Sequence, residues 1–270
     1  MRSATIDGYI SHHQIVTGLD GGDPVAAKGI RISLPATDNA STAYRNALED
    51  ELRSIFRLLP NEMALQIRWN QDGDFSENLT SYYQETESHG DNAWVRRHRQ
   101  QHYIRYSKMQ EAGLLKRKQV SLFLSSKLNR KRGKGKQRYE ESLQSSASAF
   151  GVIFREMEQS LKRLGGTSIL LDDQGLFEEC YRHLNPSQSR VCSRELLKSF
   201  RPDESILENC LSSQMTPIIG EDAGFFFDGL CHGFLALREL PQASYSGLVD
   251  LLTCLPVGGF SVVAMSIDWR

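Results

Sequence analysis

Two glycines and three basic residues stand together in Arg132-Gly133-Lys134-Gly135-Lys136, the stretch of this chain that comes nearest to a phosphate-binding loop. Such a loop needs the spacing Gly-x-x-x-x-Gly-Lys-Ser/Thr, in which backbone amides hold the phosphates and the hydroxyl binds magnesium. Here the glycines are too close together, and Gln137 stands where the hydroxyl residue belongs. The preceding residues are hydrophilic, whereas a buried strand leads into a phosphate loop. The sequence therefore predicts a mobile, solvated basic loop over residues 129–138 and no nucleotide site.

Histidines 98 and 102 are one helical turn apart, a spacing that can bind zinc. In a metalloprotease motif a glutamate follows the first histidine and acts as general base, but here that residue is Arg99. Arg96 and Arg97 add further positive charge, which opposes a metal cation. A polar helix face explains the pair better than a metal site.

Cysteine and aspartate side chains offer no stronger constellation. Cys180, His183 and Cys192 lack a fourth ligand at the usual spacing, and the first two fall in an apolar helical pattern. Asp172 and Asp173 are adjacent in a turn, so their carboxylates point in different directions and do not form an acid/base pair. The cysteines number five and form no Cys-x-x-Cys pair, as expected of free thiols in a reducing cytoplasm. The sequence thus predicts no catalytic, cofactor-binding or metal-ligating residue in this chain.

Basic residues do gather in two neighbouring segments, a helix and a loop. A solvated face is the commonest meaning of such a charge run, but the same side chains can contact anionic lipid headgroups or nucleic-acid phosphates. The candidate contacts to an anionic surface are Arg96, Arg97, Arg105, Lys116, Arg130, Lys131, Arg132, Lys134, Lys136 and Arg138.

Composition describes a folded chain of one or two domains. Its 270 residues are 40% hydrophobic and 24% charged, which is enough to build a sizeable core. The net charge of -1 provides no attraction of the whole chain toward nucleic acid or an acidic membrane. No apolar run approaches the roughly 20 residues of a membrane-spanning helix, and the N-terminus lacks the apolar core of a signal peptide.

Hydrophobic periodicity predicts alternating strands and helices as far as residue 171. We expect a hairpin of residues 13–17 and 25–34, a helix over 41–59, a strand over 63–69 with one buried face, helices near 79–87 and 93–112, a strand around 120–125, a helix over 143–164 and a strand over 167–171. The apolar stripe of the helix over 143–164 has heptad spacing, which fits either coiled-coil pairing between subunits or, more commonly, packing on its own sheet.

The second half continues with a helix over 174–184, short helical pieces to 213, strands at 225–227 and 230–237, a helix near 246–254 and a strand over 260–267. These elements predict the α+β class, with a mixed, largely antiparallel sheet, helices packed on it and ferredoxin-like split βαβ units. We divide the chain into a first lobe, 1–165, with a helical insertion, and a second lobe, 166–270. A single compact unit is the alternative.

Three short motifs stand at corresponding places in a known family. The helix over 174–184 ends in Leu184-Asn185-Pro186, Asp228-Gly229 opens a short apolar hairpin, and that hairpin ends at Leu240-Pro241. With the order of the preceding elements, this resembles the N-terminal part of the conjugative-transfer ATPases of type IV secretion systems, the TraC/TrbE/CagE/VirB family.

The resemblance implies a non-catalytic docking and oligomerisation domain. In that family the region associates with inner-membrane proteins of the secretion channel and helps build the homo-oligomer, in the cytoplasm and peripheral to the inner membrane. The motor that binds ATP and magnesium lies downstream, so we expect no ATP turnover by this chain alone. The alternative is a self-standing nucleic-acid-binding α/β module that uses the basic helix 96–108 and the loop 129–138.

Overall fold

The computed structural model describes most of the first two thirds of the chain and short pieces of the rest. The described residues are 5–10, 14–20, 23–35, 40–60, 62–88, 92–128, 135–185, 201, 206–210, 218–219, 225–227, 230–232 and 259–266. Among them, no helix combines the length and the apolar character needed to cross a bilayer.

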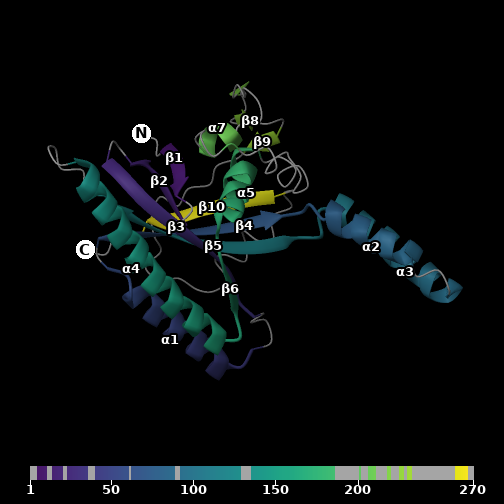
Figure 1. Ribbon diagram of the computed structural model, residues 1–270. Helices are drawn as coiled ribbons and strands as arrows, with labels where there is room; N and C mark the ends of the chain where they lie inside the picture. Colours follow the sequence, from purple (N-terminus) through teal and green to yellow (C-terminus); the bar gives the residue numbers. More distant parts are fainter. Residues whose placement is uncertain are drawn as a thin grey trace.

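A seven-stranded sheet organises the molecule (Figure 1). Its strands run in the order β1-β2-β3-β5-β4-β10. The short strand β6 pairs with the end of β3, on the same edge of β3 as β2. Every pairing is antiparallel. The strands are β1 (Thr5–Ile10), β2 (Ile15–Asp20), β3 (Asp23–Ser33), β4 (Met63–Asp72), β5 (Arg117–Lys127), β6 (Thr167–Leu170) and β10 (Gly259–Ser266).

Helix α1 (Thr42–Arg57) connects β3 to β4, and α4 (Gly135–Arg163) connects β5 to β6. These four strands stand in the order β6-β3-β5-β4, so each helix connects strands that are not neighbours. The predicted α+β class with a largely antiparallel sheet is confirmed. The predicted ferredoxin-like split units stay an interpretation of this strand order.

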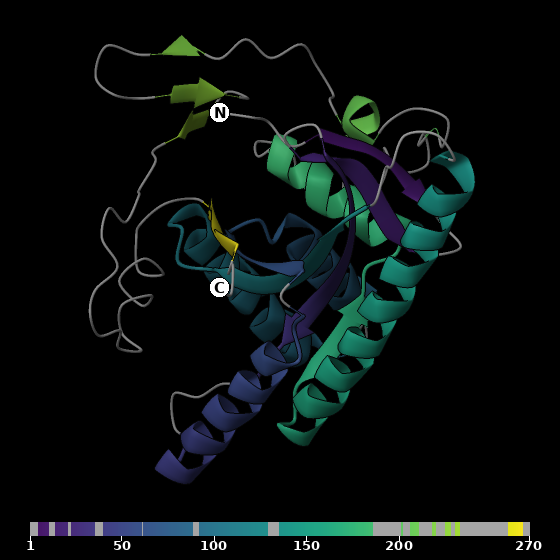
Figure 2. The ribbon, with the colours of Figure 1, turned by 90° about the vertical axis from the view of Figure 1, so that its left-hand side faces the viewer.

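Helices α1 and α4 lie side by side on one face of the sheet (Figure 2). The Ser41 hydroxyl caps α1 by accepting from the Tyr44 amide at 3.2 Å. The Tyr44 hydroxyl in turn donates to the Leu164 carbonyl at 2.8 Å, which joins the first turn of α1 to the end of α4.

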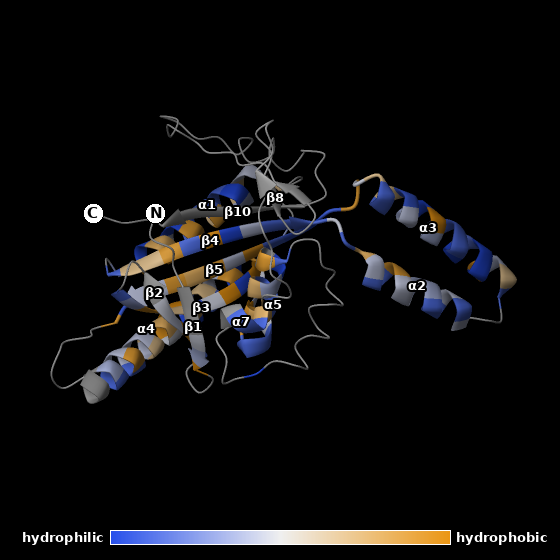
Figure 3. Cartoon of the chain, turned by 90° about the horizontal axis from the view of Figure 1, so that it is seen from above, coloured by the Kyte–Doolittle hydropathy of each residue, from blue (hydrophilic) through white to orange (hydrophobic). Residues whose placement is uncertain are grey.

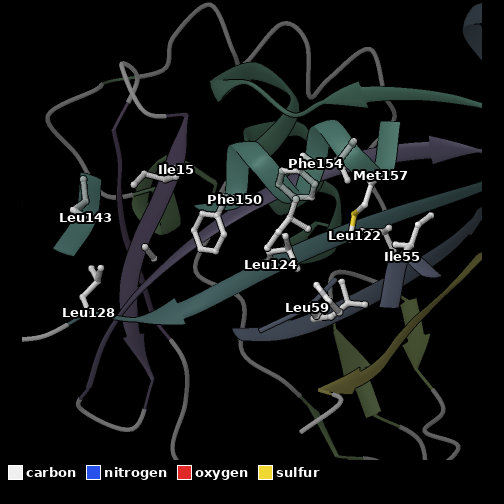
Figure 4. Close-up of a cluster of buried hydrophobic side chains, with 14 residues drawn as sticks. Ile15, Ile55, Leu59, Leu122, Leu124, Leu128, Leu143, Phe150, Phe154 and Met157 are labelled. Carbon is white, nitrogen blue, oxygen red and sulfur yellow. The ribbon is translucent and has the colours of Figure 1, made fainter. Parts of the chain in front are cut away.

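The main core fills the space between these helices and the sheet (Figure 4). Phe150 and Met157 of α4 are completely buried against Leu124 of β5, and Ile55 of α1 joins them. Burial of this stripe on the chain's own sheet is the commoner of the two interpretations given for the heptad pattern. The stripe residues Phe150, Phe154 and Met157 are therefore not available for coiled-coil pairing between subunits.

The opposite face of the sheet is covered by α5 (Asp173–Leu184), which the Asp172 carboxylate caps by accepting from the Gly175 amide at 2.8 Å. Phe177 and Tyr181 of α5 are buried with Val16 of β2 and pack against Phe123 of β5. The strand over 63–69 has the predicted buried face, with Leu65 buried in the core and Gln66 exposed on the other side, and α5 also reaches that other side at Arg68.

Asn185 ends α5 and is buried. Its side-chain amide donates to the Tyr181 carbonyl at 2.8 Å and to the Cys210 carbonyl at 2.6 Å. It thereby fixes the short helix α7 (Ile206–Cys210) against α5. The Leu-Asn pair that carried part of the family resemblance thus has a structural role here.

Strands on both sides of residue 165 share the sheet, because β6 pairs with β3 and β10 pairs with β4. The division into lobes at this position stays a prediction, since much of 186–258 lies outside the described residues. So does the helix near 246–254. A separate three-stranded sheet contains β7 (Ile218–Ile219), β8 (Phe225–Phe227) and β9 (Leu230–His232).

The start of α4 and the presence of β1 differ from the sequence predictions. Helix α4 begins at Gly135, so the predicted loop over 129–138 is wrong for its last four residues; the loop's first six, 129–134, lie outside the described residues. The helix extends because Tyr139 and Leu143 contact the core one turn apart, which anchors an N-terminal segment with no periodicity of its own. Strand β1 was not predicted, since its sequence lacks clear alternation.

Candidate functional site: a projecting helical arm

The helical insertion between β4 and β5 projects from the sheet as an antiparallel pair, α2 (Ser76–Ser88) and α3 (Ala93–Glu111) (Figure 1). We call this pair the arm. Its colours in Figure 3 are mainly hydrophilic, in contrast to the core of the sheet and helices. The arm therefore stands where a partner can reach it from several sides.

Local hydrogen bonds define the ends of the arm helices. The Asp74 carboxylate accepts from the Ser76 amide at 3.0 Å at the start of α2, and the Asn92 side chain accepts from the Trp94 amide at 3.1 Å at the start of α3. Gly113, with φ +66°, ends α3 in a conformation that favours glycine. At the base, the Gln110 side chain accepts from the Phe75 amide at 3.0 Å, so the two helices leave the sheet together.

The two arm helices contact each other mainly through aromatic rings and Arg99. The rings of Tyr83 and Tyr103 lie 5.1 Å apart. The Arg99 guanidinium lies 4.5 Å from the centre of the Tyr82 ring and donates to the Thr86 hydroxyl at 3.1 Å. Among the arm residues that the structure describes, Thr86 alone is buried. The arm is thus a thin two-layer element with little core of its own.

One side of α3 carries a row of neighbouring aromatic rings at intervals of four residues. The Trp94 and His98 rings are parallel with centroids 5.3 Å apart, His98 and His102 are 4.3 Å apart, and His102 meets Tyr106 edge to face at 5.9 Å. Across the described residues, no three His, Cys, Asp or Glu side chains gather closely enough to hold a metal ion. The histidine pair belongs to this row of rings.

A shallow groove of about 410 Å³ lies at the base of α3. Ile104, Met109 and Leu114 form its apolar part, and Arg105 and Lys108 contribute two cations. Ile104 is 53% exposed and Leu114 is 66% exposed, although both are large apolar side chains. Exposed apolar surface bordered by charge is typical of a contact site for another molecule.

The structure separates the predicted basic residues. Arg97 and Arg105 are exposed on α3, whereas Arg96 and Lys116 are half-buried at the arm. Lys136 and Arg138 belong to the start of α4, at the opposite end of the molecule from the arm (Figures 1 and 3). Arg130, Lys131, Arg132 and Lys134 lie outside the described residues. The basic helix and the start of α4 therefore do not form one continuous surface.

A buried polar cluster around Glu179 was missed by the sequence analysis. Its carboxylate accepts from the Arg31 guanidinium at 2.9 Å and from the Ser121 hydroxyl at 3.1 Å, and it also accepts from the Gln119 side chain. Arg68 lies 3.7 Å away and donates to the Glu179 carbonyl at 3.3 Å. These partners come from β3, β4 and β5, in neighbouring register on the face that α5 covers. The cluster fixes α5 to three strands.

The titratable groups near this cluster favour a structural role. Burial lowers the pKa of Arg68, while the nearby Glu179 carboxylate acts in the opposite direction. Burial raises the pKa of the Cys180 thiol to about 11 and that of Cys210 still further. Both thiols are thus protonated at neutral pH and are poor nucleophiles. The sequence feature that could have indicated this buried cluster is the alternation of polar residues in β4 and β5. The same alternation is expected of strands with one face in solvent, so it does not identify a buried polar cluster.

No protein-family model and no curated protein matches this sequence. The geometry of the arm and the short motifs Leu184-Asn185-Pro186, Asp228-Gly229 and Leu240-Pro241 are therefore the features from which function is inferred.

Proposed function

We propose that this chain is a non-catalytic docking and oligomerisation domain of a conjugative-transfer ATPase of the type IV secretion class, and that the arm is its main contact element. Its partners are inner-membrane proteins of the secretion channel and further copies of the same chain. ATP and magnesium act in a downstream motor domain. On this proposal the chain works in the cytoplasm, against the inner membrane.

The observation that carries the proposal is the arm itself. A two-helix projection with Thr86 as its one buried described residue does not add to the core of the fold. It does present exposed apolar side chains together with cations, the combination found at binding surfaces. The resemblance to the conjugative-transfer ATPases supports the assignment to a secretion system. It implies docking and assembly for the region that this chain corresponds to.

Two experiments test the proposal. The reading frame beyond Arg270 is expected to encode Gly-x-x-x-x-Gly-Lys-Ser/Thr, and a frame without this motif contradicts the ATPase assignment. In cells that express the transfer genes, the tagged protein is expected to co-purify with inner-membrane channel proteins from detergent extracts. Replacing both Ile104 and Leu114 with serine should abolish that co-purification, and Ile169→Ser, at an exposed apolar position away from the arm, should not.

Nucleic-acid binding is the second candidate, favoured by the exposed cations Arg97, Arg105 and Lys108 along α3. It predicts that the purified chain binds single- or double-stranded DNA with an affinity that falls steeply as salt is raised. Charge reversal at Arg97 and Arg105 would reduce the slope of that dependence. If no binding is seen even at low salt, the nucleic-acid candidate is wrong and the docking proposal is unaffected.

A further inference from the structure

Aromatic rings and cations share one exposed face of α3, the helix that runs from the outer end of the arm back to the sheet (Figure 1). At about 100° of rotation per residue, six exposed residues of this helix fall within an arc of about 100°. We call this arc the outer face of α3. Its residues are Trp94, Arg97, His98, Gln101, Arg105 and Lys108.

The cations of the outer face have no counter-charge in the part of the chain that the structure describes. Helix α3 contains five Lys or Arg residues and a single acidic residue, at its last position. No ion pair joins the three outer-face cations to another described residue, whereas Arg99, on the inner side of α3, pairs with Glu85 at 3.2 Å. Helix α2 contains three glutamates and no Lys or Arg. The outer face of α3 is therefore the side of the arm that attracts an anionic partner.

The rings of the outer face offer flat surfaces to that partner. The Trp94 side chain is 72% exposed, and its ring lies parallel to that of His98 with 5.3 Å between the centroids. His102 and Tyr106 continue the row at steps of four residues, about 6 Å along the helix axis. An exposed indole held in one orientation is a surface on which a nucleobase stacks with little further loss of conformational freedom.

We propose that the outer face of α3 binds a single strand of nucleic acid, with a base stacked on Trp94 and phosphates bound by Arg97, Arg105 and Lys108. From Trp94 to Lys108 the face is about 21 Å long, which at about 3.4 Å per nucleotide accommodates about six nucleotides. The inference rests on the arm being the contact element proposed above, and it gives the nucleic-acid candidate a defined site and ligand class. It requires neither a channel protein nor a motor domain.

The arrangement of rings and cations favours a single strand over a duplex. Bases inside a duplex are stacked on both sides, so a duplex would use only the cations of this face. A single strand exposes base faces and phosphates together, and both kinds of contact lie within the same arc of α3. The groove of about 410 Å³ lies at the inner end of the face, where Arg105 and Lys108 can hold a phosphate while the base enters the groove.

Other anionic partners fit this face less well. A helix that lies in a membrane surface turns its apolar side chains inward and keeps its cations on the opposite side. Here Trp94 shares its arc with Arg97 and Arg105, so inserting the indole among acyl chains would bring the guanidinium groups with it. An acidic protein segment would pair with the cations but would leave the row of rings without a contact.

Fluorescence anisotropy of the purified full chain with a labelled oligothymidylate or oligouridylate of about ten nucleotides tests the proposal. Each strand is expected to bind more tightly than a duplex of the same length. The logarithm of the affinity should fall against the logarithm of salt concentration with a slope of about -2, since each of three cations contributes about 0.7. No binding at low salt, equal affinity for the duplex, or binding only to phosphatidylglycerol vesicles overturns the proposal.

Variants separate the stacking contact from the phosphate contacts. Trp94→Ala should weaken binding by about 5- to 100-fold without changing the salt slope, and Trp94→Phe should retain most of the affinity. Arg105→Gln should reduce the slope by about 0.7. Arg57→Gln, at an exposed cation in the last turn of α1, is the control and should change neither quantity. Circular dichroism establishes that the helices are retained, and an unchanged affinity in Trp94→Ala contradicts the stacking contact.

Photo-crosslinking with an oligonucleotide that contains 5-iodouracil locates the bound strand. Crosslinks are expected to residues 94–108. Crosslinks confined to the other basic segment, residues 130–138, would place the strand there and overturn the proposal. Because the readout needs only the purified chain, a negative result is separate from the co-purification with channel proteins that tests docking.

Discussion

At the scale of single residues, Glu179 shows how a charged side chain can belong to the interior. The helix around it is apolar, with Leu176, Phe177 and Tyr181 all buried, and its own side chain is only 3% exposed. Two guanidinium groups and several hydrogen-bond donors compensate for the loss of hydration. A buried carboxylate is tolerated when such partners satisfy it, and removing it leaves buried cations without compensation.

We predict that Glu179→Gln destabilises the fold by about 3 kcal/mol, because the buried Arg68 then loses the carboxylate that it faces, while Arg31 keeps its contact with Glu178 at 3.7 Å. Chemical denaturation followed by circular dichroism measures this loss. The matched control is Glu158→Gln, which breaks a surface ion pair with Lys162 and should cost less than about 0.5 kcal/mol. Equal effects of the two variants would show that the Glu179 cluster does not fix α5 to the sheet.

At the scale of elements, the arm and the sheet are nearly independent. Asp72 and Arg117 are direct partners in the β4–β5 ladder, on either side of the insertion. The ladder can therefore be closed by a short turn without changing the register of either strand. Contacts of the arm with the sheet are confined to its base, where Arg117 lies over the Phe75 ring at 4.8 Å.

Replacing residues 75–114 with a short glycine-rich turn should leave the fold intact. We expect the free energy of unfolding to change by no more than about 1 kcal/mol, since the arm adds little to the core. Self-association and partner binding should be lost together. Denaturation and sedimentation measure these two properties separately, and a shortened chain that fails to fold would show that the insertion supports the sheet.

A second element-scale feature is an apolar cavity of about 170 Å³ between α1, α4 and the sheet. Val120 of β5, Ile67 of β4 and Leu52 of α1 are among its lining residues. A cavity of this kind leaves side chains without contacts on one side and lowers stability.

Val120→Ile should stabilise the protein by about 1 kcal/mol, because the added methyl group fills part of the cavity and keeps the β-branched shape that suits a strand. The midpoint of chemical denaturation should rise with no change in slope. Val120→Ala provides the opposite change and should destabilise. A loss of stability in Val120→Ile would mean that the cavity cannot accept the methyl group in an allowed rotamer.

At the scale of the whole molecule, the two halves of the chain share one sheet. Strand β6 pairs with β3, β10 pairs with β4, and α5 covers the second face. A fragment of residues 1–165 retains α1 and α4 on one face but exposes Val16 and Phe123 on the other.

We therefore predict that the 1–165 fragment does not show cooperative unfolding, whereas the full chain does. Its exposed face should bind a hydrophobic dye, because the apolar side chains covered by α5 become accessible. Thermal denaturation and dye fluorescence make the comparison. A fragment with a sharp transition would support the division into two lobes at residue 165.

The sequence alone determined most of the helices and strands that the structure describes, although it missed β1. Alternation over 63–69 and the steps of three and four over 143–164 are local patterns, and local backbone geometry follows from them. It likewise predicts no phosphate-binding loop of the Gly-x-x-x-x-Gly-Lys-Ser/Thr type, since that motif depends on contiguous residues. Helix boundaries such as Gly135 depended on contacts with the core and were placed less well.

Only the tertiary structure decided which residues meet. Glu179 lies 148 positions from Arg31 and 111 from Arg68, and no local pattern relates them. Trp94 and most of the residues that line the groove belong to α3, yet their exposure depends on the insertion leaving the sheet as an arm. Local periodicity selects the face of each element, whereas the packing of distant segments determines whether that face meets a neighbour, as β4 meets α5, or faces solvent, as α3 does.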